Sequence, residues 1–318
     1  MNKIAIIGVY FGNFPEYMNL WVKSCTYNKK VNFIIVTDQK NNIEAENIKY
    51  VHMSLIEFFK LASKKLNLNI NVKRPYKCCD FKPVYGIILE DYIKEYEFWG
   101  HCDFDMIFGD IKKFITDDIM RQYDKILPLG HLSLYRNTKE NNDRYKCYGS
   151  KVGNYKEVFT SDKSYAFDKI NGIYSIYKEN KFPYYDKRIF ADISMIYYRF
   201  RLALKDRNYK KQIFYWEDGK IYRAYEVKKK IKKEEYIYIH FKKRKDMRVN
   251  IKKINELESF YITSTGFYPK KKGIPSIEEI NKYNKYKGDT YECIELIKFN
   301  LKNFIEKVKR KTIKIMEK

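Results

Sequence analysis

The stretch WGHCDFDMIFGD, from Trp99 to Asp110, decides how the rest of this sequence is interpreted. An aromatic segment leads into Asp103-Phe104-Asp105, and a second apolar segment follows. This pattern predicts a buried central strand, on which side chains two residues apart point to the same face. Two carboxylates on one face of a buried strand are costly unless a cation or hydrogen bonds compensate them.

A hard divalent cation that also binds substrate phosphates would compensate both carboxylates. Asp103 and Asp105 therefore indicate a metal–phosphate site. In the alternative interpretation one Asp caps a turn and the other faces water, because a bare Asp-x-Asp often occurs by chance. The strand before the pair and the Gly109-Asp110 turn after it favour the metal site.

The first forty residues have the pattern of a doubly wound α/β fold. A β-branched run at Ile4–Val9 predicts a buried strand, Glu16–Cys25 a helix, and Val31–Thr37 a second strand that ends at Asp38. Such folds bind ligands at the carboxyl ends of their strands. The fingerprint G-x-G-x-x-G is absent, which argues against a dinucleotide site.

Periodicity and turn residues outline the remaining chain. Polar residues predict a mobile loop at Asn137–Gly153. The other expected elements are a strand at Ile48–Val51, a helix capped by Ser54 and Glu57, helices at Tyr85–Tyr92 and Phe190–Leu202, strands at Lys125–Leu129 and Tyr236–Phe241, and a hairpin around Trp216–Lys220.

Composition narrows the class of protein. The 318 residues are 45% apolar, which excludes wholesale disorder, and the net charge of +24 predicts an anionic partner. Six cysteines show no zinc spacing, and a chain of this length does not need a disulfide framework. No stretch resembles a signal peptide or a transmembrane helix, so we expect a cytoplasmic protein, soluble or peripheral at the inner face of the cell membrane.

An aromatic strand ending in Asp-x-Asp, within an α/β chain of this length, resembles the metal-binding motif of GT-A-fold glycosyltransferases. More narrowly, RPYKCCDFKPVYGIILEDY followed by FWGHCDFDMIFGDI is similar to uncharacterised glycosyltransferases of bacterial capsule and lipopolysaccharide clusters. The resemblance implies an α/β, GT-A-like fold with a Rossmann-type mixed central sheet flanked by helices. It also implies transfer of a sugar from a nucleotide diphosphate donor, which we expect to be a UDP-sugar, to a cell-surface polysaccharide or lipid-linked glycan.

The resemblance assigns donor and metal residues. The metal, Mn²⁺ or Mg²⁺, would be held by Asp105 and His240 with Asp103 assisting, and Asp103 would thereby share in catalysis. A motif H-x-x-G-x-x-K-P is absent around His240, whose ring could instead stack among tyrosines. The expected donor contacts are Tyr10, Phe11, Asp38, Lys77, Asp80, Lys82, Asp103 and Lys243. Asp38 could instead be a plain turn residue, and Lys77 a solvated surface lysine.

The acceptor side follows from the same resemblance. His131 and Arg136 are expected to contact the acceptor or a phosphate. Asp192 is the candidate catalytic base if the reaction inverts the anomeric centre, and the N-cap of the predicted helix otherwise. The sequence leaves retention and inversion open.

We expect a catalytic domain at residues 1–264, followed at 265–318 by a basic linker and an amphipathic helix. The lysines of this helix suit an anionic membrane surface, although it could instead dock on the domain. Two other functions are alternatives: a nucleic-acid-binding protein with a basic aromatic surface, and a metal-dependent nucleotidyltransferase or phosphodiesterase. Nucleic acid is not the expected partner, because no nucleic-acid-binding module is recognisable.

Overall fold

The computed structural model describes residues 3–40, 43–203, 208–242, 244 and 247–284, and within a C-terminal helix Ile294, Ile297, Lys298, Asn300, Leu301, Phe304 and Ile305. The chain divides into two compact units, Met1–Phe190 and Ala191–Lys318. The boundary expected after residue 264 falls in the turn of a hairpin within the second unit, and that domain assignment stays a prediction. In the described part of the chain, no helix is both long and apolar enough to cross a bilayer.

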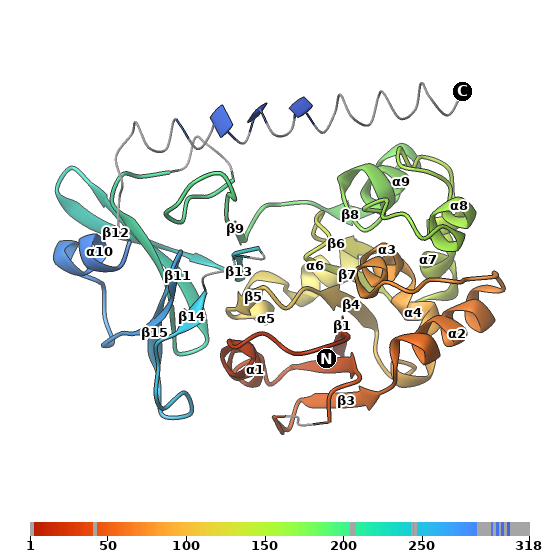
Figure 1. The fold of residues 1–318 in the computed structure, drawn as a ribbon, viewed down its shortest axis with the longest axis horizontal. Helices are drawn as coiled ribbons and strands as arrows, with labels where there is room; N and C mark the ends of the chain where they lie inside the picture. The colour runs from red at the N-terminus through yellow and green to blue at the C-terminus, as the bar shows by residue number, and fades with distance from the viewer. Residues whose placement is uncertain are drawn as a thin grey trace. The chain divides into compact units, whose positions relative to one another are not determined.

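The first unit is built on a mixed seven-stranded sheet with the order β3-β2-β1-β4-β7-β6-β8 (Figure 1). The strands from β3 to β4 are parallel, and β7 runs antiparallel to both of its neighbours. The predicted mixed central sheet is therefore confirmed. Its strands are β1 (Ile4–Tyr10), β2 (Val31–Thr37), β3 (Ile48–His52), β4 (Phe98–Cys102), β6 (Lys125–Ile126), β7 (Leu132–Arg136) and β8 (Tyr184–Tyr185).

Alternating side chains of this sheet are buried on both faces. On one face, Ala5, Ile34 and Trp99 share a core with α2, α4 and α8. On the other, Phe33 packs against Trp21 of α1 and Phe108 of β5 (Met106–Phe108). The helices are α1 (Met18–Thr26), α2 (Leu55–Leu66), α3 (Cys78–Phe81), α4 (Tyr85–Ile88), α5 (Ile111–Phe114), α6 (Asp117–Gln122), α7 (Lys139–Asp143), α8 (Tyr155–Thr160) and α9 (Ser175–Glu179).

Three local predictions in this unit meet different outcomes. The capping box of Ser54 and Glu57 at the start of α2 is confirmed. The continuous helix expected at Tyr85–Tyr92 is wrong, because the buried Leu89 leaves helical geometry between α4 and a 3₁₀ turn. The strand expected to carry Asp-x-Asp ends at Cys102, so both carboxylates lie in a bend before β5.

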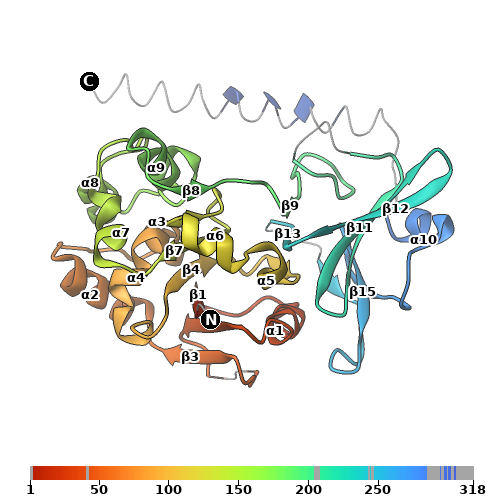
Figure 2. The ribbon, with the colours of Figure 1, turned by 180° about the vertical axis from the view of Figure 1, so that it is seen from behind.

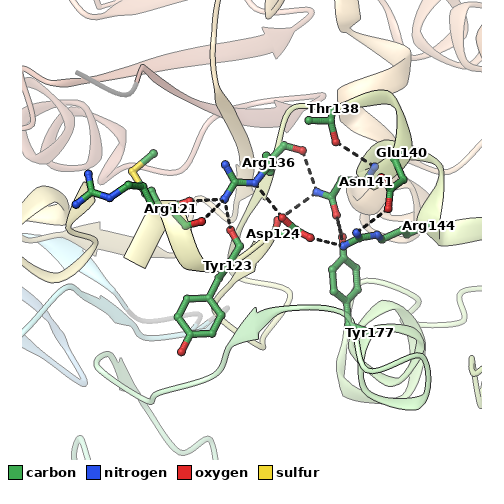
Figure 3. Close-up of polar contacts among 10 residues, drawn as sticks. Arg121, Tyr123, Asp124, Arg136, Thr138, Glu140, Asn141, Arg144 and Tyr177 are labelled. Carbon is green, nitrogen blue, oxygen red and sulfur yellow. Dashed lines mark hydrogen bonds and ion pairs between the residues drawn. The ribbon is translucent and has the colours of Figure 1, made fainter. Parts of the chain in front are cut away.

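The mobile loop predicted at Asn137–Gly153 is also wrong. This segment contains α7 and a 3₁₀ turn at Arg144–Lys146, and ion pairs with Asp124 hold it (Figure 3). Arg136 Nε lies 2.9 Å from Asp124 Oδ1, and Arg144 Nη1 lies 2.8 Å from Asp124 Oδ2. The Tyr177 hydroxyl donates to Asn141 Oδ1 at 2.6 Å. The polar residues that suggested mobility therefore order the segment.

The second unit contains a sheet with the order β12-β11-β10-β15-β16-β14 (Figure 2). The Asp218-Gly219 hairpin was predicted and is confirmed, with both residues at positive φ. One sheet face packs on α10 (Ile277–Tyr283) through Ile213, Ala224 and Ile280. The strands are β10 (Gln212–Glu217), β11 (Lys220–Val227), β12 (Lys230–Tyr236), β14 (Arg248–Val249), β15 (Ser259–Thr263) and β16 (Gly266–Pro269).

A short parallel pair in this unit replaces the helix predicted at Phe190–Leu202. β9 (Ala191–Asp192) pairs with β13 (Tyr238–His240), and the backbone then folds back through a bridge between Ile193 and Leu202. The strand expected at Tyr236–Phe241 is divided, since Tyr236 ends β12. The expected basic linker includes β16 and the buried Lys270, whose Nζ binds Glu217 at 2.8 Å.

Candidate metal and nucleotide site

The middle residue of Asp-x-Asp anchors the bend that carries the two carboxylates. Phe104 is buried. Its ring stacks on Trp21 with centroids 4.8 Å apart, and it forms an edge-to-face contact with Tyr10 with centroids 5.1 Å apart. A Cβ added to Gly8 of β1 would come within 2.6 Å of this ring, so the glycine makes room for it. Phe104 therefore fixes the bend at the carboxyl end of β4, where α/β sheets bind their ligands.

Lys82 lies beneath Asp103 and joins it to a second acid. Its buried ammonium forms an ion pair with Asp103, lies 3.3 Å from Asp168 Oδ2, and donates to the Gly130 carbonyl at 2.9 Å. Burial disfavours the ammonium ion, but the two carboxylates outweigh this effect and raise the pKa of Lys82. Lys82 is thus a permanent cation that compensates part of the charge of Asp103.

Asp168 is a site residue that sequence reasoning missed. It is buried, and burial raises the pKa of its carboxyl group although Lys82 opposes the shift. A Cβ on Gly130 would meet Asp168 Oδ2 at 2.2 Å, so a glycine is required at that approach. No local motif marks Asp168, because its contact with Lys82 spans 86 residues.

Lys77 and Asp80 are buried together and hold the segment that carries Asp168. Lys77 Nζ lies 2.8 Å from Asp80 Oδ2 and donates to the Val158 carbonyl at 2.6 Å. The carboxylate of Asp80 accepts from the backbone amides of Tyr165 and Phe167 at 3.0 and 2.9 Å. Both side chains are fully buried by these contacts, a geometry that favours a structural role; direct donor contact by Lys77 or Asp80 stays a prediction.

Asp105 lies among tyrosines at the start of the first unit. Burial raises the pKa of Tyr10, and the nearby Asp105 carboxylate raises it further. The pKa of Tyr17 is raised by the same two causes. Both phenols therefore stay protonated near Asp105, and the Tyr10 hydroxyl can donate a hydrogen bond to an oxygen ligand there.

Asp38 lies exposed at the carboxyl end of β2 and ties down the loop after β1. Its Oδ1 accepts from the Gly12 amide at 2.9 Å, and this bond lowers the pKa of the carboxyl group. Gly12 has a φ of 93°, which only glycine adopts readily. Phe11 of the same loop packs on Phe58, with ring centroids 5.9 Å apart. The structure places Asp38 and Tyr10 at the same edge of the sheet as Asp-x-Asp.

The two residues predicted to contact an acceptor differ in setting. His131 is buried beside the bend, its carbonyl accepts from the Asp103 amide at 2.9 Å, and its ring meets Phe190 edge-on at 5.1 Å. The guanidinium of Arg136 binds Asp124 and the carbonyl oxygens of Arg121 and Tyr123 at the end of α6 (Figure 3). These bonds favour a structural role for Arg136, and its contact with an acceptor stays a prediction.

In the second unit, Asp192 and His240 face each other across the β9–β13 pair. His240 Nδ1 lies 2.9 Å from Asp192 Oδ1, and Lys242 Nζ lies 3.3 Å from the other carboxylate oxygen. When Nδ1 donates its proton to Asp192, the neutral imidazole has its lone pair on Nε2. Histidines that bind metals through Nε2 are commonly oriented by such a hydrogen bond from Nδ1 to a carboxylate. Asp192 does not cap a helix, since no helix begins there. Lys243 lies outside the described residues.

Searches against solved structures found chains with distant, partial similarity to this protein. A galactosyltransferase LgtC in complex with donor and acceptor sugar analogs is 11% identical with a TM-score of 0.37, covering 59% of this chain and 75% of LgtC. The glycosyltransferase GlyE of Streptococcus pneumoniae TIGR4 is 10% identical with a TM-score of 0.34, covering 59% and 46%. Mouse xyloside xylosyltransferase 1 is 8% identical with a TM-score of 0.38, covering 61% and 88%. Similarity this distant carries no conclusion about activity.

No curated protein sequence matches the chain. One family model matches residues 6–271, which include most of β1 together with Asp-x-Asp and His240. This protein belongs to the family described as "Family of unknown function (DUF6625)".

Proposed function

We propose that this protein is a metal-dependent glycosyltransferase that moves a sugar from a nucleotide diphosphate donor to a cell-surface polysaccharide or lipid-linked glycan. We expect UDP to be the nucleotide and Mn²⁺ or Mg²⁺ the metal. The observation that carries the proposal is the bend at Asp103-Phe104-Asp105, anchored at the carboxyl end of β4 with Lys82 buried beneath it.

The chemistry of the residues fits a divalent cation and a diphosphate. Carboxylate oxygens suit Mg²⁺ and Mn²⁺, and an imidazole ligand favours Mn²⁺. Lys82 compensates Asp103 already, so Asp105 is the stronger candidate for direct metal binding. When bound, the metal would stabilise the negative charge of the departing diphosphate.

The chain's own residues would bind and orient the donor. Tyr10 can donate a hydrogen bond from its protonated hydroxyl, and the exposed Asp38 lies beside the loop after β1, where a ribose or base would be recognised. Lys82 holds the Asp103 side chain in place through their ion pair. The roles of His240 as a metal ligand, Lys243 as a diphosphate contact and His131 as an acceptor contact stay predictions.

We assign Asp192 a different role from the catalytic base predicted for it. Its hydrogen bond to His240 Nδ1 makes it a positioning residue for the imidazole. Asp192→Asn should therefore weaken Mn²⁺ binding by about 10- to 100-fold, measured by calorimetric titration without substrate. Lys242→Met, which leaves the Asp192–His240 bond in place, is the matched control. Unchanged Mn²⁺ affinity in Asp192→Asn, with sugar transfer lost, would instead identify Asp192 as the base.

We also propose peripheral attachment to an anionic membrane surface through the C-terminal helix. Its described apolar residues Ile294, Ile297, Leu301, Phe304 and Ile305 are all exposed, by 45 to 65% of their surface. Such a stripe beside lysines suits the interface between headgroups and acyl chains.

The test of the enzymatic proposal is a calorimetric titration of UDP and of GDP, with and without Mn²⁺. Binding should require Mn²⁺, disappear in Asp105→Asn, and persist in Asp118→Asn, which removes an exposed carboxylate from α6. Absence of nucleotide binding under every condition contradicts the proposal. Tight, salt-sensitive binding of an oligonucleotide in its place would favour a nucleic-acid-binding protein.

A further inference from the structure

The hairpin formed by β11 and β12 is seen in Figure 2. Its turn carries a cluster of lysines, which we call the lysine tip. Val227 pairs with Lys230, so the turn has only two residues between the strands. The members of the lysine tip are Lys228, Lys229, Lys230 and Lys232, and all are exposed.

The turn of this hairpin is unfavourable for the residues that form it. Lys228 and Lys229 have φ values of 50° and 63°, the left-handed geometry of a type I′ turn. In this geometry the Cβ of an L-residue lies close to the following carbonyl oxygen. Asn-Gly is preferred in such turns, because glycine has no Cβ and the short polar side chain of Asn can form local hydrogen bonds. Two adjacent lysines therefore occupy positions that local conformational preference assigns to other residues.

The charge of the tip is not neutralised within the described residues of the hairpin. No ion pair is formed by Lys228, Lys229, Lys230 or Lys232 in the part of the chain that the structure describes. Two nearby acids are engaged elsewhere: Glu226 lies 2.9 Å from Lys211 Nζ, and Glu234 pairs with Arg223. Like charges at neighbouring positions of a hairpin repel, so the tip would be stabilised by an anionic partner.

The side chains at the tip indicate which anion. All four cations are lysines, whose hydrated point charges suit loosely arranged headgroups better than bidentate recognition of one phosphate. The aromatic residue opposite Lys232 is Tyr225, whose ring already stacks on Tyr209 at 4.1 Å and contacts the Arg223 guanidinium at 5.2 Å. This ring is therefore engaged within the protein and is a poor platform for the base of a single-stranded nucleic acid. Val227 and Ile231 beside the turn are partly buried, so the tip would adsorb without insertion.

We propose that the lysine tip binds the anionic surface of a phospholipid membrane. This inference goes beyond the glycosyltransferase proposal, since it requires neither metal nor nucleotide. Stable peripheral attachment usually requires two weak membrane-binding contributions. The lysine tip would supply an electrostatic contribution in addition to the apolar contribution of the C-terminal helix. Each lysine near an anionic leaflet contributes about 1 kcal/mol, so two lysines correspond to roughly a 25-fold change in affinity.

The test uses the full chain and sedimentation with vesicles of phosphatidylcholine containing phosphatidylserine, compared with pure phosphatidylcholine. In the double variant Lys228→Asn, Lys229→Gly the turn receives its preferred residues while two charges are lost. The hairpin should therefore fold at least as well as before, which the thermal midpoint checks, while affinity for anionic vesicles falls roughly 25-fold.

Two controls make the result specific to the tip. Lys228→Arg, Lys229→Arg keeps the charge and should bind as the original chain does. Lys29→Asn, Lys30→Asn removes the same charge from an exposed site of the first unit and should have little effect. Equal losses in both charge-removing variants, or no loss in either, overturn the proposal. Binding of an oligonucleotide but not of anionic vesicles by the unchanged chain also overturns it, whereas the UDP titration reports separately on the enzymatic site.

Discussion

Two partly buried ion clusters of the first unit differ in how far the fold satisfies their acids. Both carboxylate oxygens of Asp124 accept from guanidinium groups, one from Arg136 and one from Arg144 (Figure 3). In the other cluster, Lys82 serves both Asp103 and Asp168. The buried Oδ1 of Asp168 accepts no hydrogen bond from the described residues.

The difference distinguishes a structural cluster from a candidate binding site. Two arginines with fixed geometry close the Asp124 cluster, which holds α7 against the end of α6. Lys82 is shared between two acids, Lys169 also lowers the pKa of Asp168, and Asp105 follows two residues after Asp103. Carboxylates gathered at the carboxyl end of a sheet are the setting in which a divalent cation contributes most.

The largest expected effect comes from removing Lys82. Lys82→Met leaves Asp103 and Asp168 without their cation, and breaking such a buried pair should lower the free energy of unfolding by about 3–5 kcal/mol. Mn²⁺ should restore part of this loss, because an ion that binds only the folded state stabilises it by mass action. Thermal unfolding with and without Mn²⁺ measures both effects.

The matched variant is Arg144→Met in the Asp124 cluster. This variant should also lower the thermal midpoint. Mn²⁺ should not raise the midpoint again, because Arg136 still forms its ion pair with Asp124. If Mn²⁺ rescues both variants equally or neither, the cluster around Lys82 is not a cation site and the comparison between the clusters fails.

Local sequence patterns predicted much of the fold. The β-branched run of β1, the short strand β3 and the Asp218-Gly219 turn depend on neighbouring residues, and each is found where it was expected. The helix predicted at Phe190–Leu202 failed for the opposite reason. β9 exists through pairing with β13, and the Asp192–His240 contact spans 48 residues, a distance at which local periodicity carries no information.

The candidate site was predictable only in part for the same reason. Asp103, Asp105 and Lys82 lie in or near a recognisable motif, whereas Asp168 is placed by tertiary packing. The backbone amides of Tyr165 and Phe167 donate to Asp80, and these hydrogen bonds position the neighbouring Asp168 next to Lys82. The same packing explains why Lys77, predicted as a donor contact, lies buried against Asp80.

A third buried cation gives a smaller and pH-dependent test of the comparison. Lys125 of β6 is buried without a carboxylate partner among the described residues, and its ammonium donates to the Leu127 carbonyl and, at 3.0 Å, to Ser133 Oγ. Burial lowers its pKa to about 7, whereas the pKa of Lys82 beside two acids is raised. The two lysines therefore show that carboxylates, and not burial alone, decide whether a buried cation keeps its proton.

The unfolded chain binds a proton at Lys125 below pH about 10, whereas the folded chain binds it only below about 7. Between these limits, the free energy of unfolding should fall by up to about 1.4 kcal/mol for each unit by which the pH is lowered.

The variant Lys125→Met should remove this pH dependence. The Leu127 carbonyl keeps a hydrogen-bond donor in the variant, because Ser133 Oγ donates to it at 3.0 Å. Lys125→Arg should destabilise the fold throughout, because a guanidinium stays charged. Urea unfolding at several pH values measures the slope, and an unchanged slope in Lys125→Met would show that Lys125 keeps its proton when buried.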